Sequence, residues 1–121
     1  DKYYEYPYYH TSLDNLSFVN AENINKSLNI YLELVDKIDK NLIYKNLKPE
    51  CEVMLSKHGL YPEIGGGVLP GSSLTELDMI LWLLYYCDGQ NNLFDISQKI
   101  NCNLTTLYQI ATKLNNKNLL K

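Results

Sequence analysis

The sequence predicts a mainly α-helical chain with minor β structure. Two patterns support this fold class. Apolar residues recur at helical spacing in the first third of the chain, and three more helical segments follow in residues 72–121. Between the two patterns, proline and glycine interrupt every period at residues 49–71. A length of 121 residues allows one modest core or two very small ones, so we expect small helical parts joined by a linker.

The chain opens with an aromatic segment at residues 3–9. Tyrosine favours strands, but Pro7 has no backbone N–H to complete a hydrogen-bond ladder. The segment is therefore predicted to be an edge strand or the end of a strand.

A long amphipathic helix is predicted next, with Asn20 as its N-cap and an end near Asn41. Its apolar residues recur at steps of three and four, which places them on one face. They are Ile24, Leu28, Tyr31, Leu32, Val35 and Ile38. We expect this apolar stripe to be buried and the charged face opposite to be solvated.

Residues 49–71 are predicted to be a linker, although an apolar one. The run of three glycines at residues 65–67 is not a phosphate-binding loop, because no Gly-Lys-Ser/Thr ending follows it. The segment before the linker, at residues 42–47, could form a short strand.

The last part, residues 72–121, is predicted to contain three helices in a helix-turn-helix layout. Ser73 and Glu76 have the spacing of a capping box that opens the first helix, which Asp88 and Gly89 stop.

The second and third helical patterns begin at Leu93 and Leu104, with a tight polar turn between them. Near the end, Leu119 and Leu120 can start a strand. A wing needs a second strand, so either the wing is vestigial or its partner strand comes from the linker before residue 72.

Charge decides whether this layout is suited to DNA. All eleven basic residues are lysine, and the net charge of the chain is −3. Arginine is the residue that grips phosphate with two hydrogen bonds and reads guanine edges. From residue 72 onward, lysines and acidic residues balance. We therefore predict a packing or protein-interaction role and argue against nucleic-acid binding, while a small DNA-binding regulator and a non-catalytic interaction module stay open as alternatives.

The three cysteines are an odd number at wide spacing, and we expect them to be reduced, which predicts a cytoplasmic location. No run approaches the roughly 20 apolar residues that span a bilayer, so no membrane association is expected. The missing initiator methionine indicates a fragment.

Only two histidines could take part in metal or acid–base chemistry, His10 and His58. His10 directly follows the aromatic segment, where sheet proteins often present site residues. Zinc requires three or four ligands, however, and no CxxC or HExxH motif supplies the others. The residues alone therefore favour an ordinary surface histidine.

Residues 9–36, YHTSLDNLSFVNAENINKSLNIYLELVD, resemble the closing segment of the co-catalytic zinc aminopeptidase superfamily. In that superfamily a His-Thr-x-x-Asp sequence follows the last core strand and precedes the last long helix. The resemblance implies that His10 is the final ligand of a two-zinc site and that Asp14 makes a hydrogen bond that orients this ligand or fixes its loop. It also implies that residues 1–48 are the terminal strand and helix of an α/β peptidase core.

Two more stretches, CEVMLSKHGLYPEIGGG and ILWLLYYCDGQNNLFDISQKI, are similar to the tail of a narrower bacterial group of aminopeptidase-like proteins. Those proteins add a winged-helix-type domain, which residues 72–121 would form, and some are encoded near polysaccharide-biosynthesis genes. His58 stands where this group leads us to expect arginine.

The superfamily's other metal ligands and its catalytic glutamate have no counterpart in this chain. The resemblance therefore implies one zinc ligand and no catalytic residue here. The expected partners are the rest of a peptidase domain and a peptide-like substrate of the intact parent protein, and a homodimer stays open as an alternative.

Overall fold

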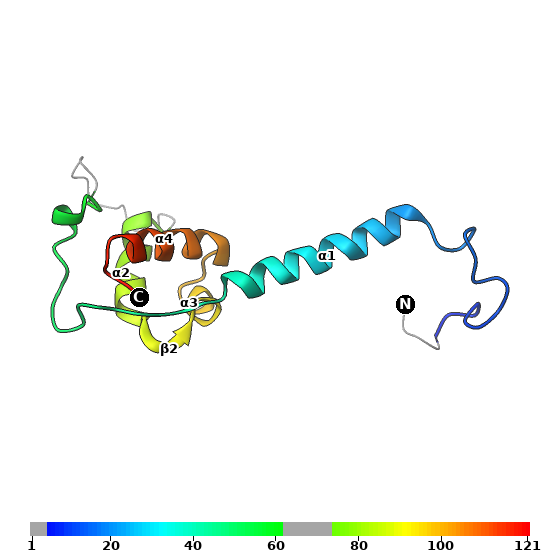
Figure 1. Cartoon of the computed structure of the whole chain (residues 1–121), viewed down its shortest axis with the longest axis horizontal. Helices are drawn as coiled ribbons and strands as arrows, with labels where there is room; N and C mark the ends of the chain where they lie inside the picture. Colours follow the sequence, from blue (N-terminus) through cyan, green and yellow to red (C-terminus); the bar gives the residue numbers. More distant parts are fainter. Residues whose placement is uncertain (1–4, 62–73) are drawn as a thin grey trace. The chain divides into compact units, whose positions relative to one another are not determined.

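The computed structural model describes residues 5–61 and 74–121 of the chain. Its elements are α1 (Ala21–Lys40), β1 (Ile43–Lys45), the 3-10 helix η1 (Leu55–His58), α2 (Glu76–Tyr86), β2 (Asp88–Asn92), α3 (Leu93–Lys99) and α4 (Leu104–Asn116) (Figure 1). They fall into two compact units, Asp1–Asp36 and Lys37–Lys121. The predicted class, mainly α with minor β, is confirmed.

In the first unit, the aromatic segment forms turns instead of the predicted strand. The backbone N–H of Tyr9 donates to the carbonyl of Tyr6 at 3.4 Å, and that of Thr11 donates to Tyr8 at 3.0 Å. The ring of Phe18 packs on Tyr6 and Tyr8, with centroids 5.5 and 5.0 Å away. A strand needs a neighbour to pair with. The described part of this unit contains no such neighbour, and residues 3 and 4 lie outside the described residues.

Helix α1 begins where the sequence predicts, because Asn20 Oδ1 accepts a hydrogen bond from the N–H of Asn23 at 2.8 Å. The expected burial of its apolar stripe is wrong for this chain. No residue of α1 is buried, and Leu28 and Val35 are 51% and 54% exposed. The described residues therefore supply no cover for the stripe. None of the helices in the described ranges has the length and apolarity needed to cross a membrane.

The second unit is built around one apolar core. Helices α2, α3 and α4 each contribute side chains with almost no exposure: Ile80, Leu83, Leu93, Ile96, Leu107 and Leu114. The turn between α3 and α4 passes through Asn101 in the left-handed region, at φ 52°, a conformation that asparagine tolerates. Asn103 then caps α4 by accepting from the N–H groups of Thr105 and Thr106. This arrangement is the predicted helix-turn-helix.

A small antiparallel sheet completes this unit. Strand β1 pairs with β2, so that Lys45 lies opposite Asp88. On its other side, Lys45 exchanges two backbone hydrogen bonds of 2.8 and 3.0 Å with Lys121. An isolated bridge joins Asn46 and Leu120, as the strand-like end of the chain predicted. The partner for the wing therefore comes from residues before the expected linker.

The described part of the expected linker contributes to the core. Leu55 and Leu60 are 4% and 6% exposed, and Tyr44 from β1 packs in the same cluster. Gly59 ends η1 at φ 62°, where a side chain would be strained. The three glycines lie outside the described residues. The domain boundaries at residues 48 and 72 stay predictions.

The cap of α2 is two residues later than predicted. Thr75 Oγ1 accepts from the N–H of Asp78 at 3.2 Å, and Asp78 Oδ2 accepts from the N–H of Thr75 at 2.9 Å. These reciprocal bonds form a capping box. The side-chain and backbone hydrogen bonds from Thr75 also hold the pKa of Asp78 below its ordinary value. Ser73 lies outside the described residues, and Glu76 is the first residue of the helix.

Asn46 links the sheet to the end of α2. Its Nδ2 donates to the carbonyl of Leu84 at 2.8 Å, and its Oδ1 accepts from the N–H of Lys48 at 2.8 Å.

We expect Asn46→Ala to lower the free energy of unfolding by about 1–2 kcal/mol, because a half-buried carbonyl loses its donor. Urea denaturation measures the change. Asn115→Ala, on the exposed face of α4, should stay within about 0.5 kcal/mol of the parent, and equal losses in both variants would contradict the account.

Burial raises the pKa of the Cys87 thiol from 9.0 to about 12, with a further increase from the charge of Asp88. Above pH 9.0 the unfolded chain therefore loses a proton that the folded chain keeps. We expect this thiol to lower the free energy of unfolding as pH rises toward 12. Cys87→Val should make the alkaline decline shallower, whereas Cys51→Val, at an exposed thiol, should not. Equal slopes in all three proteins, measured by denaturation at several pH values, would be inconsistent with a buried neutral thiol.

Candidate functional site

His10 lies in a turn of the first unit with its backbone in the left-handed region, at φ 58°. Histidine is found in this region more often than most residues, but the conformation still costs about 1–2 kcal/mol. The imidazole ring packs on the ring of Tyr9, with centroids 4.2 Å apart, and the residue as a whole is exposed. The chain thus presents the imidazole at its surface on a strained backbone.

Thr11 organises the loop that follows. Its Oγ1 donates to the carbonyl of Tyr8 at 2.7 Å and accepts from the N–H of Leu13 at 3.2 Å. Its carbonyl accepts from the N–H of Asp14 at 3.1 Å. The His-Thr-x-x-Asp sequence is therefore a unit of consecutive hydrogen-bonded turns.

Asp14 ties this loop to the aromatic segment. Its Oδ2 accepts a hydrogen bond of 2.8 Å from the hydroxyl of Tyr6. That bond is the main reason why the pKa of Tyr6 lies above its ordinary value. In the described residues no hydrogen bond joins Asp14 to His10. The structure therefore gives Asp14 a partner in the aromatic segment, and its relation to a metal ligand stays a prediction.

Within residues 5–61 and 74–121, no three His, Cys, Asp or Glu side chains lie close enough together to hold a metal ion. Because zinc needs three or four protein ligands, the described residues do not fit a zinc ion by themselves. A zinc ion on His10 would need its other ligands from outside the described residues. His58 lies in η1, in the second unit, and joins no such group among the described residues.

The outer face of α4 is the second candidate site, because it corresponds to the DNA-reading helix of a helix-turn-helix. Thr106, Gln109 and Lys113 line a shallow hollow of about 220 Å³ with α2. The ammonium group of Lys113 lies 2.7 Å from Glu76 Oε1. The cation that would meet a phosphate is already paired with a carboxylate, which weakens attraction to nucleic acid.

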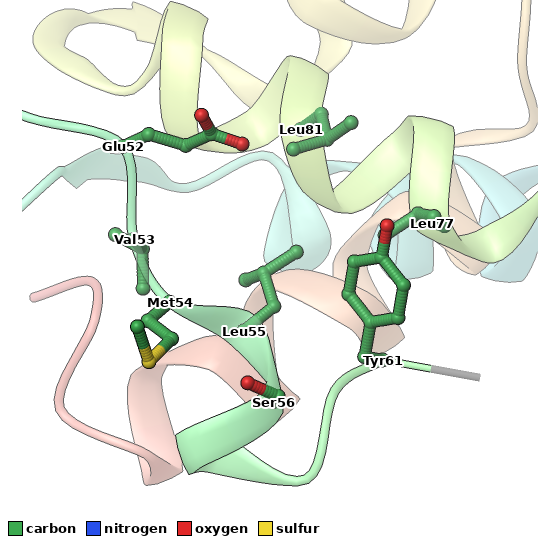
Figure 2. A pocket seen from close by; sticks show the side chains of 8 residues that line it. All are labelled: Glu52, Val53, Met54, Leu55, Ser56, Tyr61, Leu77 and Leu81. Atoms are coloured by element: carbon green, nitrogen blue, oxygen red, sulfur yellow. The ribbon is translucent and has the colours of Figure 1, made fainter. Parts of the chain in front are cut away.

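A groove of about 320 Å³ runs between the η1 segment and α2 (Figure 2). Its walls are mostly apolar, with Met54 and Leu55 on one side and Leu77 and Leu81 on the other. No groove is predicted here from the sequence, because one of its walls belongs to the expected linker.

The profile of a winged helix-turn-helix family matches residues 42–121, and that of a domain of unknown function matches residues 1–41. A protein of Clostridium acetobutylicum, provisionally named a polysaccharide biosynthesis protein with an aminopeptidase-like domain, is 38% identical over 118 residues, which are 98% of this chain and 26% of that protein.

A solved crystal structure is also similar to the chain. It belongs to a protein of Clostridium acetobutylicum that is provisionally named a peptidase, and it matches with a TM-score of 0.70 and 31% identity. The match covers 98% of this chain and 24% of that one. The chain therefore spans about a quarter of the length of each of these relatives.

Proposed function

The chain belongs to the winged helix-turn-helix family through residues 42–121, and we propose that it is part of a zinc-dependent aminopeptidase-like hydrolase. It would contribute one metal ligand, one packing helix and a winged-helix packing domain. The observation that carries this proposal is that 98% of the chain is similar to about a quarter of two longer proteins, one named for an aminopeptidase-like domain and one for a peptidase.

The width of the apolar face of α1 supports a large partner. Ile30 and Leu34 are exposed beside the stripe, at 65% and 52%. At about 100° per residue, the apolar positions together span roughly 200° of the helix circumference. A two-stranded coiled coil uses a much narrower seam. The helix therefore suits a surface made by several elements, such as the rest of a peptidase domain, better than a second copy of itself.

The geometry of the first unit supports His10 as the metal ligand. Backbone strain in proteins concentrates at functional sites, and the surrounding turns hold His10 in its left-handed conformation. Imidazole is also the commonest metal-ligating side chain. The other ligands, the catalytic groups and the surface that binds a peptide-like substrate would come from the rest of the parent protein. No catalytic residue is assigned to this chain.

The packing role of the second unit rests on charge. No arginine is present, and Lys113 is paired with Glu76. A reader of DNA needs an excess of positive charge to attract phosphate, so the DNA-binding alternative has only the fold in its favour. The three cysteines are unpaired, in keeping with a reducing, cytoplasmic location.

Loss of the proposed ligand should remove metal from the parent protein. We expect His10→Ala to lower its zinc affinity and its metal-dependent peptide hydrolysis at least about 100-fold, more than the loss seen for residues that only orient ligands. Elemental analysis and a peptidase assay measure the two effects. His58→Ala is the matched control and should keep both. Unchanged zinc content and turnover in His10→Ala would refute the assignment.

Polar substitution of the α1 stripe should have an effect only where the stripe is covered. Leu28→Gln keeps a good helix former and should change the stability of the 121-residue chain by less than about 0.5 kcal/mol. In the parent protein the same change should cost about 2–3 kcal/mol, because it places an amide in an apolar interface. Glu33→Gln, on the charged face, is the control. Equal effects of Leu28→Gln in the two proteins would argue against a buried stripe.

A further inference from the structure

The second unit carries an exposed apolar surface that its own core does not use. Met54, Tyr61 and Leu81 line the groove of Figure 2, and Trp82 and Tyr85 lie one and four residues beyond Leu81 on α2. Each of these five side chains is between 41% and 74% exposed. We call this set the apolar strip. Contiguous exposed apolar surface of this kind marks interaction sites in soluble proteins.

The aromatic end of the strip is held in place before any partner arrives. The ring of Trp82 stacks on Tyr86 with centroids 5.5 Å apart, and Tyr85 meets Trp82 edge-on at 6.1 Å. The ammonium group of Lys99 lies 5.0 Å from the centroid of the Tyr86 ring. Side chains that are already ordered lose little entropy on binding. Tryptophan and tyrosine are also the residues that most often dominate the energy of an interface.

The charges near the strip limit what can bind there. Helix α2 carries acidic residues only in its first turn, Glu76 and Asp78, whereas the charge beside Tyr86 at its aromatic end is the ammonium group of Lys99 from α3. Within the described part of the chain, Glu52, on the wall of the groove, has no hydrogen bond or ion pair. A partner segment should therefore be apolar and should bring a lysine, an arginine or a backbone N–H to Glu52.

We propose that the apolar strip is the surface through which the second unit docks on the rest of the same, longer polypeptide. This inference rests on the proposed function and names the packing surface. About three quarters of the length of each relative lies outside the part that this chain matches. In a parent protein of similar length, that remaining part would be a large partner on the same polypeptide.

The short link between α1 and β1 favours the rest of the polypeptide as the partner over a second copy of the chain. Only Asn41 and Leu42 lie between α1 and β1. Both are bound to the start of α3, since Asn41 Oδ1 accepts from the N–H of Phe94 at 2.8 Å and the carbonyl of Leu42 accepts from Leu93 at 2.9 Å. If α1 packs on the rest of the polypeptide, this short link sets an effective concentration on the order of millimolar for the second unit. A separate copy would have to compete with it.

Oxidative footprinting by hydroxyl radicals, read by mass spectrometry, tests the proposal because it reports the exposure of individual side chains. We expect Met54, Trp82 and Tyr85 to be modified about fivefold more slowly in the parent protein than in the 121-residue chain, as exposed side chains enter a water-excluding interface. Phe94, which is 48% exposed on α3 and outside the strip, should not change. Equal modification of the strip in both proteins would overturn the proposal.

A substitution in the strip of the parent protein provides a second, independent test of the docking surface. Tyr85→Glu should restore rapid modification of Met54 and Trp82, because a carboxylate cannot enter the apolar interface, whereas Phe94→Glu should leave them protected. Both sites are exposed on helices, so neither variant disturbs the core. Protection that survives Tyr85→Glu would count against the strip.

The remaining occupants are also outcomes of the experiment. A strip that is already protected in the 121-residue chain would overturn the proposal. If sedimentation then shows a dimer that Tyr85→Glu dissociates, a second copy covers the strip. If sedimentation shows a monomer, another part of the same chain covers it. Footprinting does not depend on metal. A protected strip in a protein whose His10→Ala variant keeps its zinc would refute the ligand and leave the docking surface standing.

Discussion

Burial of apolar surface is the constraint on which this structure depends, and the two units meet it differently. In the second unit, segments from both sides of residues 62–73 close one core: Tyr44 and Leu55 come from before them, and α2, α3 and α4 from after them. The pairing of Lys45 with β2 on one side and with Lys121 on the other fixes the ends of this unit. Helix α1, most of which lies in the first unit, is amphipathic but has no buried residue.

This difference explains which predictions from the sequence succeeded. Helical spacing and the Asn20 cap predicted α1 well, because both depend on neighbours within the helix. Burial of the α1 stripe could not be predicted, because the pattern shows which face is apolar and not what covers it. The expected strand does not form at residues 5–9, the described part of the aromatic segment, for the related reason that a strand depends on a partner. The cap at Thr75 was missed because two pairs of residues have the spacing of a capping box. Ser73 precedes Glu76 by as many residues as Thr75 precedes Asp78.

The candidate sites also differ in whether they depend on local or on long-range contacts. The His10 loop could be found from the sequence, since its Thr11 and Tyr8 bonds are local and its motif is short. The groove between η1 and α2 could not, because Pro49 and the later glycines predict a linker, while Leu55 and Leu60 fold into the core of the second unit. Long-range packing determines that surface, and a single sequence contains little information about it.

The winged helix-turn-helix fold by itself does not imply DNA binding. Here the lysine of α4, the helix that would read bases, is paired with a carboxylate. Apolar surface that the described residues do not cover is found on α1 and on α2. Both features are those of a part that packs within a larger protein. A crystal structure of the parent protein with anomalous data at the zinc edge tests this account most directly. The account predicts a zinc ion about 2.0–2.1 Å from an imidazole nitrogen of His10, with the α1 stripe buried. A metal site remote from His10, with the stripe open to solvent, would contradict it.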